Sequence, residues 1–260
     1  ALTPARAAKL DEKLRRAARA VRLDRIDLAI RDAFRRLVWP TLPEGGVPDW
    51  WEHPGTAALV AAVCNLAPIE RRLGLALLAR RAGPRPWLPW DQPANRRFLD
   101  RLTARRIDPG PWLDRRETTS ILDGKTLVLA LEDDPLEILR MGEHFSTCLS
   151  LQGVNFFSAV VNAVDVNKRV LYARGPSGTV MGRCLIALTD EGNLLTFEPY
   201  AHDRKLRFGD RVASFVEDLA RAMGARVGTG GTVSTLVAKR WYDDGTHDLT
   251  GRLQALAGGS

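Results

Sequence analysis

Apolar residues in the first part of the chain recur at every third or fourth position, which is the period of an amphipathic α-helix. The pattern runs through residues 4–38 and through residues 56–82, where a proline interrupts it. Another short helix is expected over residues 95–106. Four prolines between residues 83 and 93 exclude regular helix, so that stretch predicts an extended connector. Together these segments predict an all-helical, arginine-rich domain over residues 1–118.

The pattern changes to shorter apolar runs after Thr118. Residues 126–131 form a run typical of a strand, and Asp134 followed by Pro135 predicts the start of a helix that ends near Met141. Next, a second helix and three strands are expected, over residues 155–165, 169–174, 179–189 and 193–200. Turns rich in glycine and polar residues separate these strands, which predicts an antiparallel meander.

The strongest helical pattern lies at residues 208–223. Its apolar residues form one continuous stripe, and Gly224 follows as a residue that commonly ends helices. Residues 226–227 and 232–241 predict two further strands. Residues 119–260 are therefore expected to form an α+β domain, in which a mixed, mostly antiparallel sheet packs against helices.

The net charge of +7 is distributed unevenly along the chain. Residues 1–118 contain 23 Lys or Arg against 14 Asp or Glu, whereas the remainder contains 15 against 17. This excess predicts a basic surface that binds nucleic acid or an acidic protein. Nearly all of it is arginine, which a GC-rich genome also produces, so a solvated helix face is the alternative.

The composition favours a cytoplasmic protein that does not enter membranes. No apolar run approaches the length of a membrane span, and the start of the chain lacks the apolar segment of a signal peptide. The three cysteines are widely spaced and form no CxxC pair, which fits a reducing compartment. No His and Cys spacing matches a known zinc pattern, so no metal site is predicted.

Candidate acid–base residues gather at the end of the last expected strand. Glu198, Tyr200 and His202 occupy alternate positions, so strand geometry predicts that they share a face. A carboxylate or imidazole base beside a phenolic proton donor suits general acid–base catalysis. The alternative is that Tyr200 and His202 only pack and hydrogen-bond beneath the last helix.

A basic turn follows directly. Arg204, Lys205 and Arg207 precede the helix that contains Gly209, and helix N-termini bind anions through backbone N–H groups and the helix dipole. A phosphate site is therefore one hypothesis. A plain solvated helix start, with Asp210 opposing the anion, is the alternative.

The order of elements over residues 125–229 resembles the core of the GNAT acyltransferases: strand, two helices, three strands, long helix, strand. Arg204 and Gly209 match the family's phosphate-binding pattern Q/R-x-x-G-x-G/A, whereas Arg207 replaces its first glycine. A side chain there obstructs the close approach of phosphate to the backbone. The N-terminal helices have no counterpart in the family.

The resemblance implies a coenzyme A thioester as cofactor, bound at Arg204, Lys205, Arg207 and Gly209. It further implies that Glu198 or His202 deprotonates an amine and that Tyr200 protonates the leaving thiolate. The residues do not specify the acceptor, which is a small molecule or a protein.

A second candidate centre is Cys148. If a helix continues through this region, His144 and Cys148 lie four residues apart on one face, within reach of each other. An imidazole beside a thiol is the minimum for an activated nucleophile, and His202 offers another base. By contrast, Cys184 shares strand parity with apolar residues and is predicted to be buried.

Three functions are thus consistent with the sequence. The leading hypothesis is acyl transfer from a thioester donor to an amine or another nucleophile. The second is a cysteine-dependent hydrolase or transferase that uses Cys148 with His144 or His202. The third is a non-enzymatic adaptor whose basic helices bind nucleic acid or protein.

Overall fold

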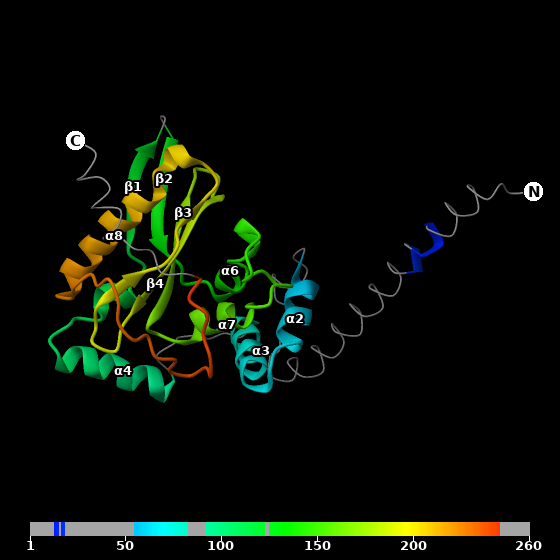
Figure 1. Cartoon of the computed structure of the whole chain (residues 1–260), viewed down its shortest axis with the longest axis horizontal. Coiled ribbons are helices and arrows are strands. Elements are labelled where there is room, and N and C mark those ends of the chain that lie inside the picture. Colours follow the sequence, from blue (N-terminus) through cyan, green and yellow to red (C-terminus); the bar gives the residue numbers. More distant parts are fainter. Residues whose placement is uncertain (1–12, 16, 19–54, 83–91, 123–124, 245–260) are drawn as a thin grey trace, which may run out of the picture.

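The computed structural model of the chain describes residues 13–15, 17–18, 55–82, 92–122 and 125–244 (Figure 1). The helix expected over residues 4–38 and most of the proline-rich connector lie outside the described residues. Among the described residues, no helix has the length and apolar character needed to cross a bilayer.

Strands among the described residues form one curled antiparallel sheet of six (Figure 1). They are β1 (Glu117–Leu122), β2 (Lys125–Leu131), β3 (Lys168–Arg174), β4 (Val180–Leu188), β5 (Leu194–Thr196) and β6 (Tyr200–Ala201). The spatial order is β1-β2-β3-β4-β5, and β6 also pairs with β4. The predicted α+β class is confirmed for this part of the chain, although β1 was not among the expected strands.

One face of the sheet is covered by helices α2 (Thr56–Cys64), α3 (Pro68–Ala82), α6 (Pro135–Leu139) and α7 (Phe157–Val164). The buried residues of these helices share a core with alternate residues of β4 such as Leu185. Asp134 accepts a hydrogen bond from the Leu136 N–H at 2.9 Å, so the predicted N-cap of α6 is confirmed.

The opposite face packs against α4 (Pro93–Ala104), α5 (Gly110–Leu113) and α8 (Phe208–Met223). Cys184 and Ile186 of β4 point into this second core, as predicted for Cys184. Helix α8 has the predicted bounds and ends at Gly224, whose φ of 69° is left-handed. Described helices that precede Thr118 therefore pack on both faces of this sheet. The domain boundary predicted at Thr118 stays a prediction.

The strand expected over residues 193–200 is divided by a β-bulge. Thr196 pairs with Ile186 and Tyr200 pairs with Arg183, so a step of four residues lies opposite a step of three. The extra residue places Tyr200 on the same face as Phe197, whereas strict alternation would place it on the opposite face. The bulge therefore turns Tyr200 toward Arg183.

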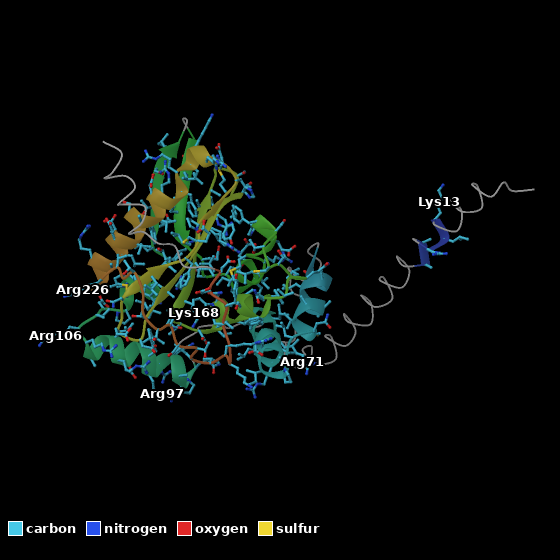
Figure 2. All side chains as sticks on the ribbon, in the orientation of Figure 1. Lys13, Arg71, Arg97, Arg106, Lys168 and Arg226 are labelled. Carbon is cyan, nitrogen blue, oxygen red and sulfur yellow. The ribbon has the colours of Figure 1, made fainter. Side chains whose placement is uncertain are left out.

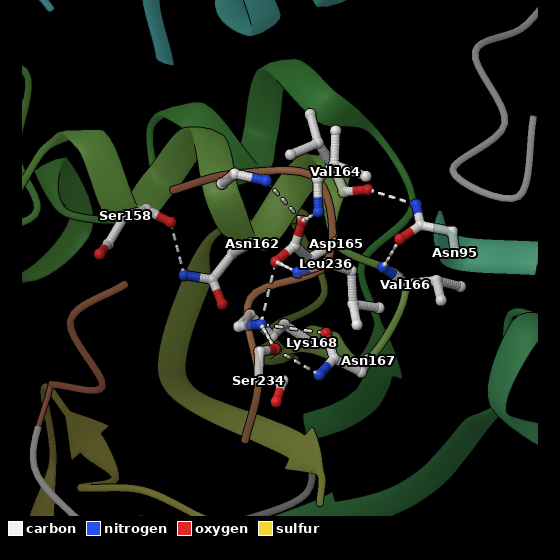
Figure 3. A network of polar contacts seen from close by, with 12 residues as sticks. Asn95, Ser158, Asn162, Val164, Asp165, Val166, Asn167, Lys168, Ser234 and Leu236 are labelled. Carbon is white, nitrogen blue, oxygen red and sulfur yellow. Dashed lines mark hydrogen bonds and ion pairs between the residues drawn. The ribbon is translucent and has the colours of Figure 1, made fainter. Parts of the chain in front are cut away.

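The prediction of a strand over residues 232–241 was wrong. After α8, Val227 forms a single parallel bridge with Leu194, and residues 228–244, here called the C-terminal segment, form no regular strand. The backbone N–H groups of Leu236, Val237 and Ala238 donate to the carboxylate of Asp165 instead (Figure 3). A buried carboxylate thus provides the partners that a neighbouring strand would otherwise supply.

Candidate functional site around Cys148 and Arg183

The loop that carries Cys148 folds back tightly on itself between α6 and α7. Two glycines permit this, because a Cβ atom on Gly142 would lie 2.1 Å from the Ser150 nitrogen, and one on Gly153 would lie 2.1 Å from the Cys148 carbonyl oxygen. Only glycine fits at such distances. The Asn155 N–H also donates to the Cys148 carbonyl at 3.0 Å, which closes the loop around the cysteine.

The helix that would have joined His144 to Cys148 is not formed. A short 3-10 helix, η4, spans Glu143–Phe145, and Ser146 is left-handed with φ 50°, so the chain changes direction between the two residues. The imidazole of His144 lies 3.7 Å from the Glu137 carboxylate and edge-on to the ring of Tyr172. His144 therefore belongs to a different polar cluster from Cys148.

The half-buried Cys148 thiol lies near polar side chains of its own loop and of the C-terminal segment. The Asn155 side-chain amide donates to the sulfur at 3.4 Å. Cys148 is also the main cause that raises the pKa of Tyr242, an exposed residue of the C-terminal segment. The thiol is thus held by an amide donor of its own loop and lies within electrostatic reach of Tyr242.

Arg183 lies beside this loop, at the centre of β4, with a side chain that is 0% exposed. Its Nη1 donates to the Met141 carbonyl at 3.1 Å and to the Thr147 hydroxyl at 3.4 Å, and its Nη2 forms an ion pair with Asp244. The guanidinium carbon lies 4.6 Å from the centre of the Tyr200 ring. One buried cation therefore joins the Cys148 loop, β6 and the C-terminal segment.

Tyr200 remains a proton donor at neutral pH. Its hydroxyl donates to the second oxygen of Asp244 at 3.3 Å, and burial together with that carboxylate raises the pKa of Tyr200 to about 12. Burial likewise raises the pKa of Asp244. A phenol in this state donates hydrogen bonds and does not act as a base.

Of the three predicted acid–base residues, two are held together by one ring. His202 stacks on Phe145 with ring centres 4.4 Å apart, and the Tyr200 ring lies 5.9 Å from the same ring. Phe145 precedes Cys148 by only three residues, so His202 is attached to the Cys148 loop. Glu198 lies in the β-bulge and is exposed.

The predicted anion-binding turn is exposed at the start of α8. Arg204 and Lys205 form the 3-10 helix η5 (Arg204–Leu206), and Arg207 is left-handed with φ 45°. The Arg207 Nε donates to the carboxylate of Asp210 at 2.8 Å, so an acidic side chain already partly neutralises this turn. Gly209 is half-buried in the first turn of α8. A phosphate site there stays a prediction.

A cavity of about 360 Å³ opens between the edge of β5 and the C-terminal segment. Its lining residues are Leu195, Phe197, Gly231, Val233, Trp241, Tyr242 and Asp243. A volume of this order suits a small organic ligand. Tyr242, whose pKa Cys148 raises, is one of these lining residues.

Sequence reasoning missed Asn155, Arg183, Tyr242 and Asp244. Only Arg183 carried a local signal, since it is the one charged residue in the otherwise apolar or small stretch 180–188. The others are brought to the site by tertiary packing. Among the described residues, no group of three or more potential metal ligands is found.

Comparison with protein-family models, characterised proteins and solved structures found no match to this chain.

Proposed function

We propose that the chain catalyses acyl transfer, to water or to another nucleophile, with the thiol of Cys148 as the attacking group. The observation that supports this most is the position of the half-buried Cys148 thiol, which accepts from the Asn155 amide and lies within electrostatic reach of Tyr242, a residue that lines the cavity. A nucleophilic cysteine needs an accessible sulfur, a base and space for its substrate, and we assign these roles to Cys148, His202 and the cavity.

In the proposed reaction, His202 takes the thiol proton and the sulfur forms a bond to the acyl carbon. The leaving group departs with a proton from His202, which leaves a thioester on Cys148. A second nucleophile, water or an amine, then loses a proton to His202 and attacks the thioester. The carbon–sulfur bond breaks, the acyl product leaves, and the sulfur takes the proton from His202, which restores the thiol. His202 is assigned this role because it is the exposed imidazole held against Phe145 of the Cys148 loop.

The other groups of the site have separate roles in this proposal. The apolar side chains of Leu195, Phe197 and Trp241 would hold the acyl chain in the cavity. The Tyr200 phenol, protonated at neutral pH, would donate to oxygen atoms that gain negative charge during the reaction.

Direct transfer from a coenzyme A thioester, without a covalent enzyme intermediate, is the second candidate. It is supported by the order of elements, in which β5, β6 and η5 precede α8, and the chain after α8 returns to β5 through the parallel bridge between Val227 and Leu194. The exposed Arg204 and Arg207 would then bind the donor's phosphates. Cys148 would be dispensable in this mechanism.

One experiment separates the two mechanisms. Hydrolysis of p-nitrophenyl acetate and butyrate, and transfer from acetyl-coenzyme A to a panel of amines, are measured for wild type and Cys148→Ala. Loss of the nucleophile should lower turnover by about 10⁴-fold or more. Intact-mass spectrometry of the quenched wild type should show one acyl group on Cys148.

The matched control is Cys64→Ala, which removes a half-buried cysteine that packs against the core. A fully active Cys148→Ala variant would exclude the covalent mechanism. If activity in that variant also falls when Arg204 and Arg207 are both replaced by alanine, direct transfer from coenzyme A is favoured instead.

A further inference from the structure

The buried guanidinium of Arg183 is incompletely bonded. Nη1 has two acceptors and Nη2 has Asp244, but Nε is buried and has no hydrogen-bond partner among the described residues. A buried charged group normally uses all its donors, because an unmet donor costs free energy. The open Nε position therefore marks capacity for another acceptor atom.

Asp244 is a poor match for this guanidinium. Arginine–carboxylate pairs are frequently bidentate, with two parallel N–H···O bonds. Asp244 instead gives one oxygen to Nη2 and the other to the Tyr200 hydroxyl. The chain's own carboxylate thus leaves Nε without an acceptor among the described residues.

We infer that Arg183 is a binding site for the carboxylate group of a small ligand, and that Asp244 occupies this site when the ligand is absent. The incoming carboxylate accepts one hydrogen bond from Nε and one from Nη2, and it displaces the side chain of Asp244. Displacement is local, because Tyr242, two residues before Asp244, stays anchored by its N–H to the hydroxyl of Ser158 at 2.6 Å.

The chemistry of the site favours a carboxylate over a phosphate. A carboxylate replaces Asp244 with no change in net charge, whereas a phosphate dianion adds negative charge to a buried position with one cation. The guanidinium also lies against the Tyr200 ring, with its carbon 4.6 Å from the ring centre. The ring covers one face of the guanidinium, so an acceptor approaches the N–H groups along the edge, where a planar carboxylate fits.

The position of Arg183 connects this ligand to the proposed reaction. Its Nη1 contacts Thr147, the neighbour of Cys148, so the inferred carboxylate site lies beside the Cys148 loop. The identification of this ligand as the acyl substrate or the acceptor rests on the proposed function. The binding of a carboxylate to Arg183 is independent of that function.

Calorimetric titration tests the inference without using activity. Acetate and succinate, with phosphate as comparison, are titrated at constant ionic strength into wild type, Asp244→Ala and Asp244→Asn. Both Asp244 variants should bind carboxylates at least about tenfold more tightly than wild type. Wild type should still bind the same carboxylates, more weakly, because Asp244 competes for Arg183 and so reduces the fraction of protein in which Arg183 is available to the ligand.

The matched control is Cys148→Ala, which should bind carboxylates as wild type does, so failure of the thiol chemistry and failure of this site are distinguished. Arg183→Lys keeps the charge but lacks the fork, and binding should be lost. Absence of carboxylate binding by a folded Asp244 variant would overturn the inference. Tighter binding of phosphate than of carboxylate would overturn it as well. Carboxylate binding by the Asp244 variants without any binding by wild type would also overturn it, because Asp244 would then be a permanent structural partner of Arg183.

Discussion

Two buried arginines of this fold, Arg183 and Arg169, bind groups from segments that are distant in the sequence. Arg183 is held by the Cys148 loop and the C-terminal segment, as described above. Arg169 of β3 donates from Nη1 to the Trp112 carbonyl at 3.2 Å, and burial lowers the pKa of Arg169 to about 10, so it stays charged at neutral pH. Such residues order the segments that they contact, because a buried charge without a partner is costly.

Glu137 provides a test of pH dependence at the level of one residue. The imidazole of His144 and the guanidinium of Arg174 lower the pKa of Glu137 to about 2 from its ordinary value near 4.5. A folded-state pKa below the unfolded-state value stabilises the fold above pH 4.5, and this contribution is lost as the pH falls from about 4.5 to 2.

Glu137→Gln should therefore lower the free energy of unfolding at pH 7 by about 1 kcal/mol, allowing for solvent screening of a partly exposed group. The difference from wild type should shrink below pH 4.5 and vanish near pH 2. Urea unfolding at pH 7, 4 and 3 measures it, with Glu217→Gln on the exposed face of α8 as control. A pH-independent difference would contradict the assignment.

Among the elements, α8 shows how a helix specified by local sequence is positioned by one distant residue. Its first residue, Phe208, lies directly over Gly182 of β4, and a Cβ atom there would lie 2.9 Å from the ring. Since Gly182 precedes Arg183, the same contact determines how closely α8 packs behind the candidate site.

Gly182→Ala should lower the free energy of unfolding by about 1–3 kcal/mol, because it forces Phe208 away from the sheet. Gly230→Ala is the matched control, since a Cβ atom at Gly230 meets no atom within 4 Å. That variant should stay within about 0.5 kcal/mol of wild type. Guanidinium unfolding of the three proteins measures both. Equal stability of the two variants would show that α8 adjusts without cost.

At the scale of the whole molecule, a buried polar network attaches the C-terminal segment to the body of the protein (Figure 3). Asp165, at the end of α7, accepts backbone hydrogen bonds from residues 236–238 and pairs with the buried ammonium of Lys168 at 3.1 Å. The Lys168 ammonium also donates to the Ser234 carbonyl at 2.9 Å. Tyr242 and Asp244 reach the candidate site only because this network holds the segment that precedes them.

Asp165→Asn should therefore have effects at two places. It leaves the Lys168 charge without its carboxylate, which typically costs about 3–5 kcal/mol for a buried pair. It also weakens attachment of the C-terminal segment, so trypsin should cleave faster after Lys239 and Arg240. The control is Asp218→Asn, which breaks an exposed ion pair with Arg221 and should cost at most about 1 kcal/mol. Cleavage rates unchanged in Asp165→Asn would contradict this role of the network.

Local sequence determined the elements whose signals lie within a few residues. The helix over residues 208–223 was predicted with its bounds because its apolar stripe and terminal Gly224 are both local. The N-cap at Asp134 was predicted for the same reason. Patterns of β-branched and apolar residues failed over 232–241, because a strand also needs a neighbouring backbone, and Asp165 took its place.

Tertiary structure decided which residues meet at the candidate site. Arg183 and Asp244 are 61 residues apart and join only when β4 and the C-terminal segment pack together. Cys148 was found from its sequence neighbourhood, but its partner Tyr242 was not, and the expected partner His144 is turned away by the left-handed Ser146. Periodicity records which face of an element is buried, whereas the identity of a polar partner depends on where distant segments meet. That meeting is set by packing of the two cores and by the need of each buried charge for a counter-charge.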